Sequence, residues 1–364
     1  MTETEASIIL NMLPHMGPVR FGKLRERLGS AVAILSAKGN DLRRVEGIGT
    51  EVSETILHWE KHVDLSAELT HIADFGARVL ISSDKEYPAL LREIYDPPIV
   101  LYVFGKLQER DHHHGIGIVG TRKPSYYALE SAKKLGYQLA HAGLTVYSGL
   151  ARGIDTAAHQ AALAANGRTV AVLGSGLKQL YPKENQQLAE KIASSGAVIS
   201  EFSMETSPSK QTFPKRNRII SGCSFGLLVI EAGARSGALI SAHQAIEQGR
   251  SLYAVPGRID QIETHGSNRL IQQGAKLVID ASDVFNDLPM IFSKQPELQQ
   301  SKPKVELSHD DLAIYQAIDN DPTTFDVIIE KSCLPPAVVS SRLLALELSR
   351  HVRSFPGGRF VKLI

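Results

Sequence analysis

The 364-residue sequence has only two cysteines and no long hydrophobic run. Cys223 and Cys333 lie far apart and form no CxxC pair, which argues against a disulfide framework and against a zinc site. No apolar run approaches the roughly 18 residues that a membrane-spanning helix needs. The acidic N-terminus also lacks the basic and apolar segments of a signal peptide. We therefore expect a soluble cytoplasmic protein without membrane association.

The sequence also has no large excess of positive or negative charge, because its 40 Lys and Arg residues are balanced by 39 Asp and Glu residues. A net charge of +1 means that any nucleic-acid site must be a local basic patch. The sequence contains no GxxxxGK[ST] or HExxH motif and no nucleophile elbow, because its one GxSxG pattern, at 222–226, precedes an apolar run instead of following one. These absences argue against a P-loop ATPase, a hydrolase with a nucleophile elbow and a zincin metalloprotease.

One glycine motif, at residues 115–120, matches G-x-G-x-x-G. Its first two glycines open the apolar run, whereas a dinucleotide-binding motif follows the strand and opens the helix. The acidic residue expected about 20 positions later is also missing. We therefore predict no dinucleotide and no other cofactor. The tract at 112–114, HHH, resembles a metal-binding sequence, but it precedes a strand and is interpreted as a surface loop.

The centre of the chain alternates apolar runs with helical patterns. Most runs are continuous in Val, Ile and Leu, which is typical of parallel strands buried on both faces. The pattern predicts an α/β fold with an extended Rossmann-like, doubly wound parallel sheet over residues 71–290. The predicted strands are 99–105, 116–120, 144–149, 169–176, 197–202, 225–232, 251–257 and 276–280.

Residues 1–70 predict a separate helical domain with many glycines. Gly47 and Gly49 mark a tight turn, and Thr50 is a plausible N-cap of the helix that follows. The segment resembles a helix-hairpin-helix or SAM-like module, and such hairpins can offer N–H groups to a DNA phosphate. We favour a purely structural role, because no Lys or Arg flanks the hairpin after Arg44.

The C-terminal region predicts a polar linker at 291–307 and a winged-helix-like domain at 308–364. Three short helical patterns are followed by a hairpin that turns at 356–358. From Glu306 onward there are six Lys or Arg residues and eight Asp or Glu residues. Because a DNA-reading helix is basic, we favour a protein-contact or regulatory role for this domain.

The loops after six of the predicted strands converge on one edge, because parallel strands end on the same side of a sheet. Most of these loops are rich in Gly, Ser or Arg. Small residues allow a ligand to approach the backbone closely, and the N–H groups at helix starts attract anions. The edge therefore predicts a phosphate-bearing ligand. The loop at 207–218, SPSKQTFPKRNR, adds an aromatic ring beside several cations, the combination that single-stranded nucleic acid needs.

An alternative is a Rossmann-like nucleotide-processing enzyme that uses Glu231 or Asp155, with His159 nearby, for proton chemistry. We favour structural roles for these groups, because no Ser or Cys stands in a nucleophile context. In that interpretation Asp155 caps a loop or pairs with Arg152, and Glu231 holds a loop through hydrogen bonds.

Several segments together, in this order, resemble the DNA-processing protein A family (DprA, also called Smf). They include VGTRKPS, SGLARGIDTAAH, YPKEN, FPKRNRIISG and VIEAGARSGALISA, and the resemblance spans residues 87–280. It implies a non-catalytic Rossmann domain that binds single-stranded DNA without sequence preference. It also implies protection of incoming strands, loading of the recombinase RecA during natural transformation, and a homodimer.

The resemblance further implies a DNA pocket. Its residues are Arg122, Ser148, Gly149, Arg152, Lys183, Phe213, Lys215, Arg216, Asn217 and Arg218. The four cations at 122, 183, 215 and 216 suit phosphates, the ring at 213 suits a base, and the amide at 217 suits a base or sugar. Arg218 is either a further contact or an anchor to Glu231.

Overall fold

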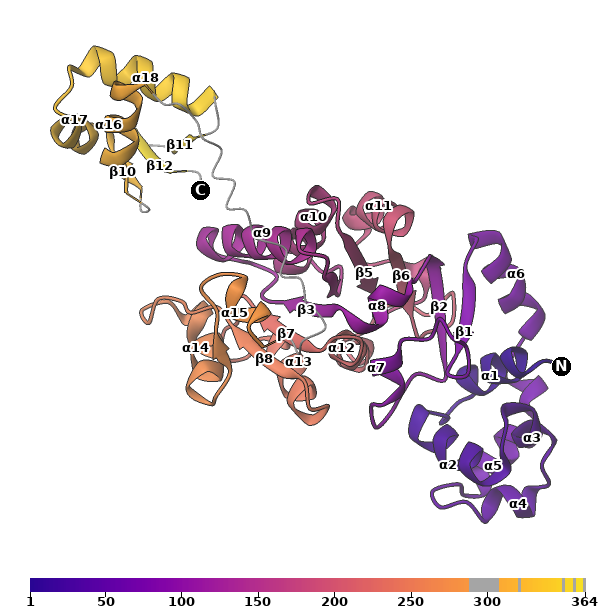
Figure 1. Cartoon of the computed structure of the whole chain (residues 1–364). Coiled ribbons are helices and arrows are strands. Elements are labelled where there is room, and N and C mark those ends of the chain that lie inside the picture. The colour runs from indigo at the N-terminus through magenta and orange to yellow at the C-terminus, as the bar shows by residue number, and fades with distance from the viewer. Residues whose placement is uncertain (288–307, 320–321, 349–350, 356–357, 363–364) are drawn as a thin grey trace. The chain divides into compact units, whose positions relative to one another are not determined.

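The computed structural model describes residues 1–287, 308–319, 322–348, 351–355 and 358–362 (Figure 1). The chain divides into two compact units, Met1–Lys294 and Gln295–Ile364. None of the described helices combines the length and the apolar character that crossing a bilayer requires. The expected linker at 291–307 and the turn residues 356–357 lie outside the described residues.

The chain begins with a helical region, as predicted. Its helices are α1 (Glu3–Met12), α2 (Pro18–Leu28), α3 (Ala31–Ser36), α4 (Gly39–Arg43), α5 (Thr50–Leu57) and α6 (Leu65–Phe75). Gly47, in the turn between α4 and α5, has a φ of 83°, which glycine adopts readily. The predicted N-cap at Thr50 is wrong, because Thr50 is the first helical residue and Gly49 occupies the cap position.

This helical region packs directly on the sheet that follows. Apolar residues of α1 share one buried core with strand residues such as Val100 and Tyr102. Polar contacts add to it: Asn11 donates to the carbonyl of Glu201 over 2.9 Å, and the N–H of Met204 donates to Glu68 over 2.9 Å. The segments expected as separate domains at 1–70 and 71–290 therefore share a core within one unit.

The central sheet has nine strands in the order β1-β2-β6-β5-β4-β3-β7-β8-β9. Strands β3 to β9 pair in parallel, whereas β1 and β2 form an antiparallel edge on β6. This confirms the predicted fold class; only the short β1 has no counterpart among the predicted strands. The strands are β1 (Arg78–Ile81), β2 (Val100–Gly105), β3 (Gly115–Val119), β4 (Thr145–Ser148), β5 (Arg168–Val172), β6 (Ala197–Ser200), β7 (Gly226–Val229), β8 (Ser251–Ala254) and β9 (Lys276–Leu277).

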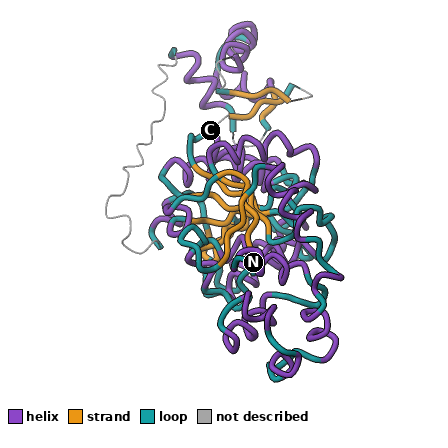
Figure 2. Tube along the Cα trace, turned by 90° about the vertical axis from the view of Figure 1, so that its right-hand side faces the viewer, coloured by secondary structure: helices purple, strands orange, loops and turns teal. Residues whose placement is uncertain are grey.

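Helices cover both faces of the sheet, as Figure 2 shows from the side. One layer contains α9 (Tyr126–His141), α10 (Ile154–Ala164) and α11 (Gln186–Ser195), and the other contains α12 (Thr212–Gly222) and α13 (Gly237–Glu247). Shorter helices flank them: α7 (Ala89–Arg92), α8 (Glu109–His113), α14 (His265–Gln272) and α15 (Ser282–Phe285). The two-sided burial explains why the strands are continuously apolar.

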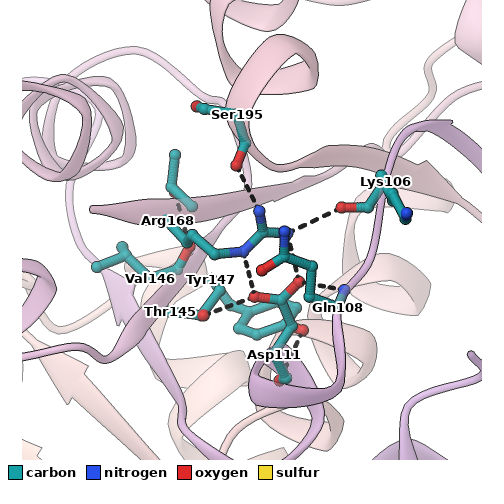
Figure 3. Close-up of polar contacts among 9 residues, drawn as sticks. Lys106, Gln108, Asp111, Thr145, Val146, Tyr147, Arg168 and Ser195 are labelled. Atoms are coloured by element: carbon teal, nitrogen blue, oxygen red, sulfur yellow. Dashed lines mark hydrogen bonds and ion pairs between the residues drawn. The ribbon is translucent and has the colours of Figure 1, made fainter. Parts of the chain in front are cut away.

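A buried ion pair ties together the amino ends of the central strands (Figure 3). The Arg168 guanidinium contacts both oxygens of Asp111 at 2.8 and 2.6 Å and donates to the carbonyls of Lys106 and Ser195. Thr145 donates its hydroxyl to the same carboxylate over 2.7 Å. The HHH tract beside Asp111 is not the predicted surface loop, because α8 includes its first two residues and buries His112.

The second unit is a small α/β domain with its own core, built around Ile314, Ile328, Val339, Leu343 and Val352. Its helices are α16 (His309–Ala317), α17 (Phe325–Ser332) and α18 (Pro336–Leu348). Its sheet has the order β10-β12-β11, from β10 (Thr323–Thr324), β11 (Val352–Phe355) and β12 (Arg359–Lys362). Three helices with a β hairpin confirm the predicted winged-helix architecture.

Candidate nucleic-acid interface

The carboxyl edge of the sheet is crossed by the first turns of α12. The ring of Phe213 lies against the loop after β5, so that a Cβ at Gly174 would stand only 2.8 Å from the ring. The guanidinium of Arg216 lies even closer to the position of a Cβ at Gly149, after β4. Glycine is required at both positions because α12 side chains occupy the space that a Cβ would need.

Arg216 is buried beneath this edge, with 4% of its surface exposed. Its Nη1 donates to the carbonyl of Gly149 over 2.5 Å and to the carbonyl of Val172. Burial lowers the pKa of Arg216 to about 10, an effect that the nearby Asp155 partly offsets. The side chain thus ties the ends of β4 and β5 together, so that the predicted phosphate contact Arg216 is buried and engaged within the protein.

Arg218 is likewise part of the scaffold, with 7% of its surface exposed. Its Nε contacts Asp96 at 2.9 Å and its Nη2 contacts Glu201 at 2.5 Å. The suggested anchor to Glu231 is wrong, because the carboxylate partners of Arg218 are Asp96 and Glu201. The pair with Glu201 joins α12 to the end of β6, because Glu201 follows that strand directly.

Two further predicted contacts also lie inside the protein. The hydroxyl of Ser148 is fully buried and donates to the carbonyl of Ile118 over 2.6 Å. The N–H of Gly149 donates to Asp155 over 3.1 Å, and its carbonyl accepts from Arg216. Both polar groups of this glycine are therefore engaged internally, so that Ser148 and Gly149 shape the edge from below.

The remaining predicted residues meet at the surface of the same edge. Arg122 is exposed, and its guanidinium carbon lies 5.1 Å from the centre of the half-buried Phe213 ring. Lys183 and Lys215 are exposed and form no hydrogen bond or ion pair with any residue that the structure describes. Asn217 is half-buried and accepts from Arg216 over 3.1 Å. Arg122 therefore lies over the Phe213 ring, and the neighbouring segments of the same edge carry two more exposed cations.

Arg152 also reaches the surface, but it is paired. Its Nε and Nη2 contact the two oxygens of Glu184 at 2.6 and 2.7 Å. The hydrogen bonds raise the pKa of Arg152 and lower the pKa of Glu184. The suggested pairing of Arg152 with Asp155 is wrong, since Asp155 instead accepts from the N–H groups of Gly149 and Ala151.

One aromatic residue of this edge was missed from the sequence. The ring centre of Tyr181 lies 6.0 Å from that of Phe213, with an angle of 53° between the ring planes. Tyr181 precedes Lys183 in YPKEN, and the sequence interpretation assigned that segment to its lysine alone. A tyrosine two residues before a predicted phosphate contact was the available signal.

The groups considered for proton chemistry are structural. Both oxygens of the buried Glu231 accept from Ser125, at 2.9 Å from its N–H and 2.5 Å from its hydroxyl, and so hold the start of α9. Burial raises the pKa of Asp155, while the adjacent Arg216 lowers it. His159 contacts Thr169 at 2.6 Å, and its burial lowers the pKa of the imidazole to about 3. The favoured structural interpretation of Glu231 is confirmed.

Comparison with known proteins decides the family. Residues 78–289 match the model of the DNA recombination-mediator protein A family, and residues 299–358 match the DprA winged helix domain. The chain belongs to the DprA/Smf family. Because this is a family of recombination mediators, the expectation of a non-catalytic protein agrees with the match.

Relatives of this DprA/Smf protein cover most of its length. Protein Smf of Synechocystis sp. is 34% identical to this chain, and the match covers 95% of this chain and 95% of the relative's length. DNA processing protein DprA of Bacillus subtilis is 44% identical, and the match covers 59% of this chain and 72% of the relative's length. The crystal structure of DprA from Streptococcus pneumoniae matches with a TM-score of 0.69 and 34% identity, over 79% of this chain and 99% of that chain.

A second solved structure concerns the single-stranded DNA binding mode of DNA processing protein A from Helicobacter pylori. It matches this DprA/Smf chain with a TM-score of 0.52 and 28% identity, over 58% of this chain and 94% of that chain.

Proposed function

We propose that the carboxyl edge of the central sheet binds single-stranded DNA with little regard to sequence. The observation that carries this proposal is the half-buried Phe213 ring with the exposed Arg122 at 5.1 Å, in an edge whose neighbouring segments also carry the exposed cations Lys183 and Lys215. A ring provides a stacking surface for any base, and the cations neutralise the phosphates on either side. The solved H. pylori relative adds support from the same family.

The residues of the edge divide into two groups by exposure. Arg122, Lys183 and Lys215 contact phosphates, Phe213 stacks on a base, and the amide of Asn217 bonds to a base or sugar. Arg152 joins the phosphate contacts once DNA displaces Glu184. The buried members hold these groups in place and touch no DNA; they are Ser148, Gly149, Arg216 and Arg218.

The test is fluorescence anisotropy of a labelled mixed-sequence oligonucleotide at low salt. We expect tight binding by the wild type and strong loss in the Arg122→Ala/Lys183→Ala/Lys215→Ala variant. A matched control removes three exposed cations near the opposite edge, where Arg168 binds Asp111 and the carbonyls of Lys106 and Ser195: Lys106, Arg110 and Lys191. Equal loss in both variants would show that net charge, and not this edge, determines binding.

In the cell, we propose that the protein protects single strands and delivers them to the RecA recombinase. Membership in a recombination-mediator family supports this role. The test measures RecA assembly on oligonucleotides in the presence of wild-type protein or of the triple variant. Unchanged assembly with the triple variant would separate DNA binding from delivery and contradict the proposal.

We also propose that two copies of the chain form a homodimer, as expected for the family. Ile259 and Ile262, which follow β8, are 89% and 70% exposed, and such apolar side chains are typical of a surface that a second copy covers. Sedimentation of the wild type and of an Ile259→Glu/Ile262→Glu variant tests this. A wild-type monomer, or a variant that remains dimeric, would contradict it.

A further inference from the structure

Tyr181 is an aromatic side chain that protrudes from a firmly held segment. Asn185, four residues later in the same segment, donates to the carbonyl of Leu150 over 2.8 Å and to the hydroxyl of Thr156 over 2.9 Å. These hydrogen bonds fasten the segment to the loop after β4 and to the start of α10. The tyrosine itself keeps 42% of its surface exposed. Its backbone is therefore positioned by the fold while its ring stays available to a ligand.

The surroundings of Tyr181 form an ordered row of rings and cations. Arg122 lies over Phe213 at 5.1 Å, and Phe213 lies 6.0 Å from Tyr181. Arg152 lies in the loop after β4 that Asn185 fastens to the segment of Tyr181, and it contacts Glu184 of that segment at 2.6 Å. The four residues come from the segments after β3, β4, β5 and β6, with Phe213 in the first turn of α12. A single exposed tyrosine is ordinary on a protein surface, whereas two adjacent rings with cations nearby match a stacking platform.

We propose that Tyr181 is a second base-stacking surface, so that Phe213 and Tyr181 hold two successive bases of one strand. This inference rests on the proposed function of the edge. The ring planes meet at 53°, and bases that lie flat on the two rings therefore cannot stay stacked on each other. The strand must unstack at this step, which excludes a base-paired duplex and favours flexible strands. Thymine tracts unstack more readily than adenine tracts, and oligo(dT) therefore binds more tightly than oligo(dA).

The experiment compares the wild type with Tyr181→Ala, Tyr181→Phe and a matched control, Tyr137→Ala. Tyr137 is 44% exposed in the last turns of α9, where it stacks on His141. Anisotropy is measured with labelled oligo(dT) and oligo(dA), and circular dichroism verifies that each variant is folded. We expect Tyr181→Ala to weaken oligo(dT) binding about 5- to 150-fold, the range for loss of one base–aromatic stack, and to reduce the preference for oligo(dT). Tyr181→Phe and Tyr137→Ala keep wild-type affinity.

The outcomes separate this inference from the function on which it rests. If the wild type binds no oligonucleotide, the proposed function fails. If Phe213→Ala loses affinity while Tyr181→Ala binds oligo(dT) like the wild type, the interface stands and the second stacking surface is refuted. Loss of affinity in Tyr181→Phe as large as in Tyr181→Ala would assign the effect to the hydroxyl and overturn the stacking role. A wild type that binds oligo(dA) at least as tightly as oligo(dT) would refute the unstacked geometry.

Discussion

Lys215 and Arg216 are adjacent cations of one motif, and the structure predicts opposite consequences for their substitution. Lys215 is exposed and forms no hydrogen bond or ion pair with the residues that the structure describes, so Lys215→Ala removes one phosphate contact and leaves the fold intact. Loss of one contact reduces the slope of log affinity against log salt by about 0.7 for a single strand. Between 50 and 200 mM salt, this change corresponds to a difference of about threefold in affinity.

Arg216→Lys keeps the buried positive charge, but its ammonium ends one bond short of the Nη1 position that serves both carbonyls, and it has no equivalent of the Nε that donates to Asn217. The hydrogen bonds to the carbonyls of Gly149 and Val172 are then weakened, at a cost of about 1–3 kcal/mol in the free energy of unfolding. The salt slope of DNA binding stays at the wild-type value, because Arg216 is buried and contacts no phosphate in this account.

Two assays on the same variants separate the roles. Urea unfolding followed by circular dichroism gives the free energy of unfolding, and salt titration by anisotropy gives the slope. Lys215→Ala is expected to change only the slope, and Arg216→Lys only the stability. A wild-type unfolding midpoint together with a reduced salt slope in Arg216→Lys would refute the reasoning and restore Arg216 as a phosphate ligand.

Three further predictions follow from contacts elsewhere in the first unit. Glu184→Gln releases Arg152 and is expected to tighten DNA binding and to steepen its salt dependence in anisotropy titrations; weaker binding contradicts this. His159 has a folded-state pKa of about 3, below its ordinary value, so its contribution to stability is complete above about pH 6.5 and is lost as the pH falls toward 3. This amounts to about 1.4 kcal/mol per pH unit, and urea unfolding at pH 7, 6 and 5 should show it in the wild type but not in His159→Asn. Arg168→Leu leaves Asp111 buried without its cation and should cost about 3–5 kcal/mol in unfolding free energy; an unchanged midpoint would count against that pair.

The sheet was predictable because strands that are buried on both faces consist of nearly continuous runs of apolar residues. Runs such as 225–230 are apolar, and every predicted run became a strand of the sheet, parallel to its neighbours except at 99–105, which forms the antiparallel β2. The edge strand β1 was harder to predict from the sequence, because it has only four residues and begins with the charged Arg78. The extension of the core onto the N-terminal helices depends on contacts between residues far apart in the chain, such as Asn11 with Glu201, which no local pattern reveals.

The sequence predicted where the interface lies, but it did not predict which of its cations are exposed and which are buried. Arg122, Lys215 and Arg216 offer similar chemistry in the sequence, and helical periodicity does not separate the last two. For Lys215 and for Arg216, the residues three and four positions further along the helix are buried. What distinguishes Arg216 is the pair of carbonyls at Gly149 and Val172, which only the folded sheet brings within reach.

The most direct test of the account is the salt dependence of oligonucleotide binding by the Arg122→Ala/Lys183→Ala/Lys215→Ala variant. Loss of three phosphate contacts should reduce the slope of log affinity against log salt by about 2 relative to the wild type. The variant that lacks the exposed cations at 106, 110 and 191 should keep the wild-type slope. Equal slopes for the wild type and the first variant would contradict the assignment of this edge as the DNA-binding site.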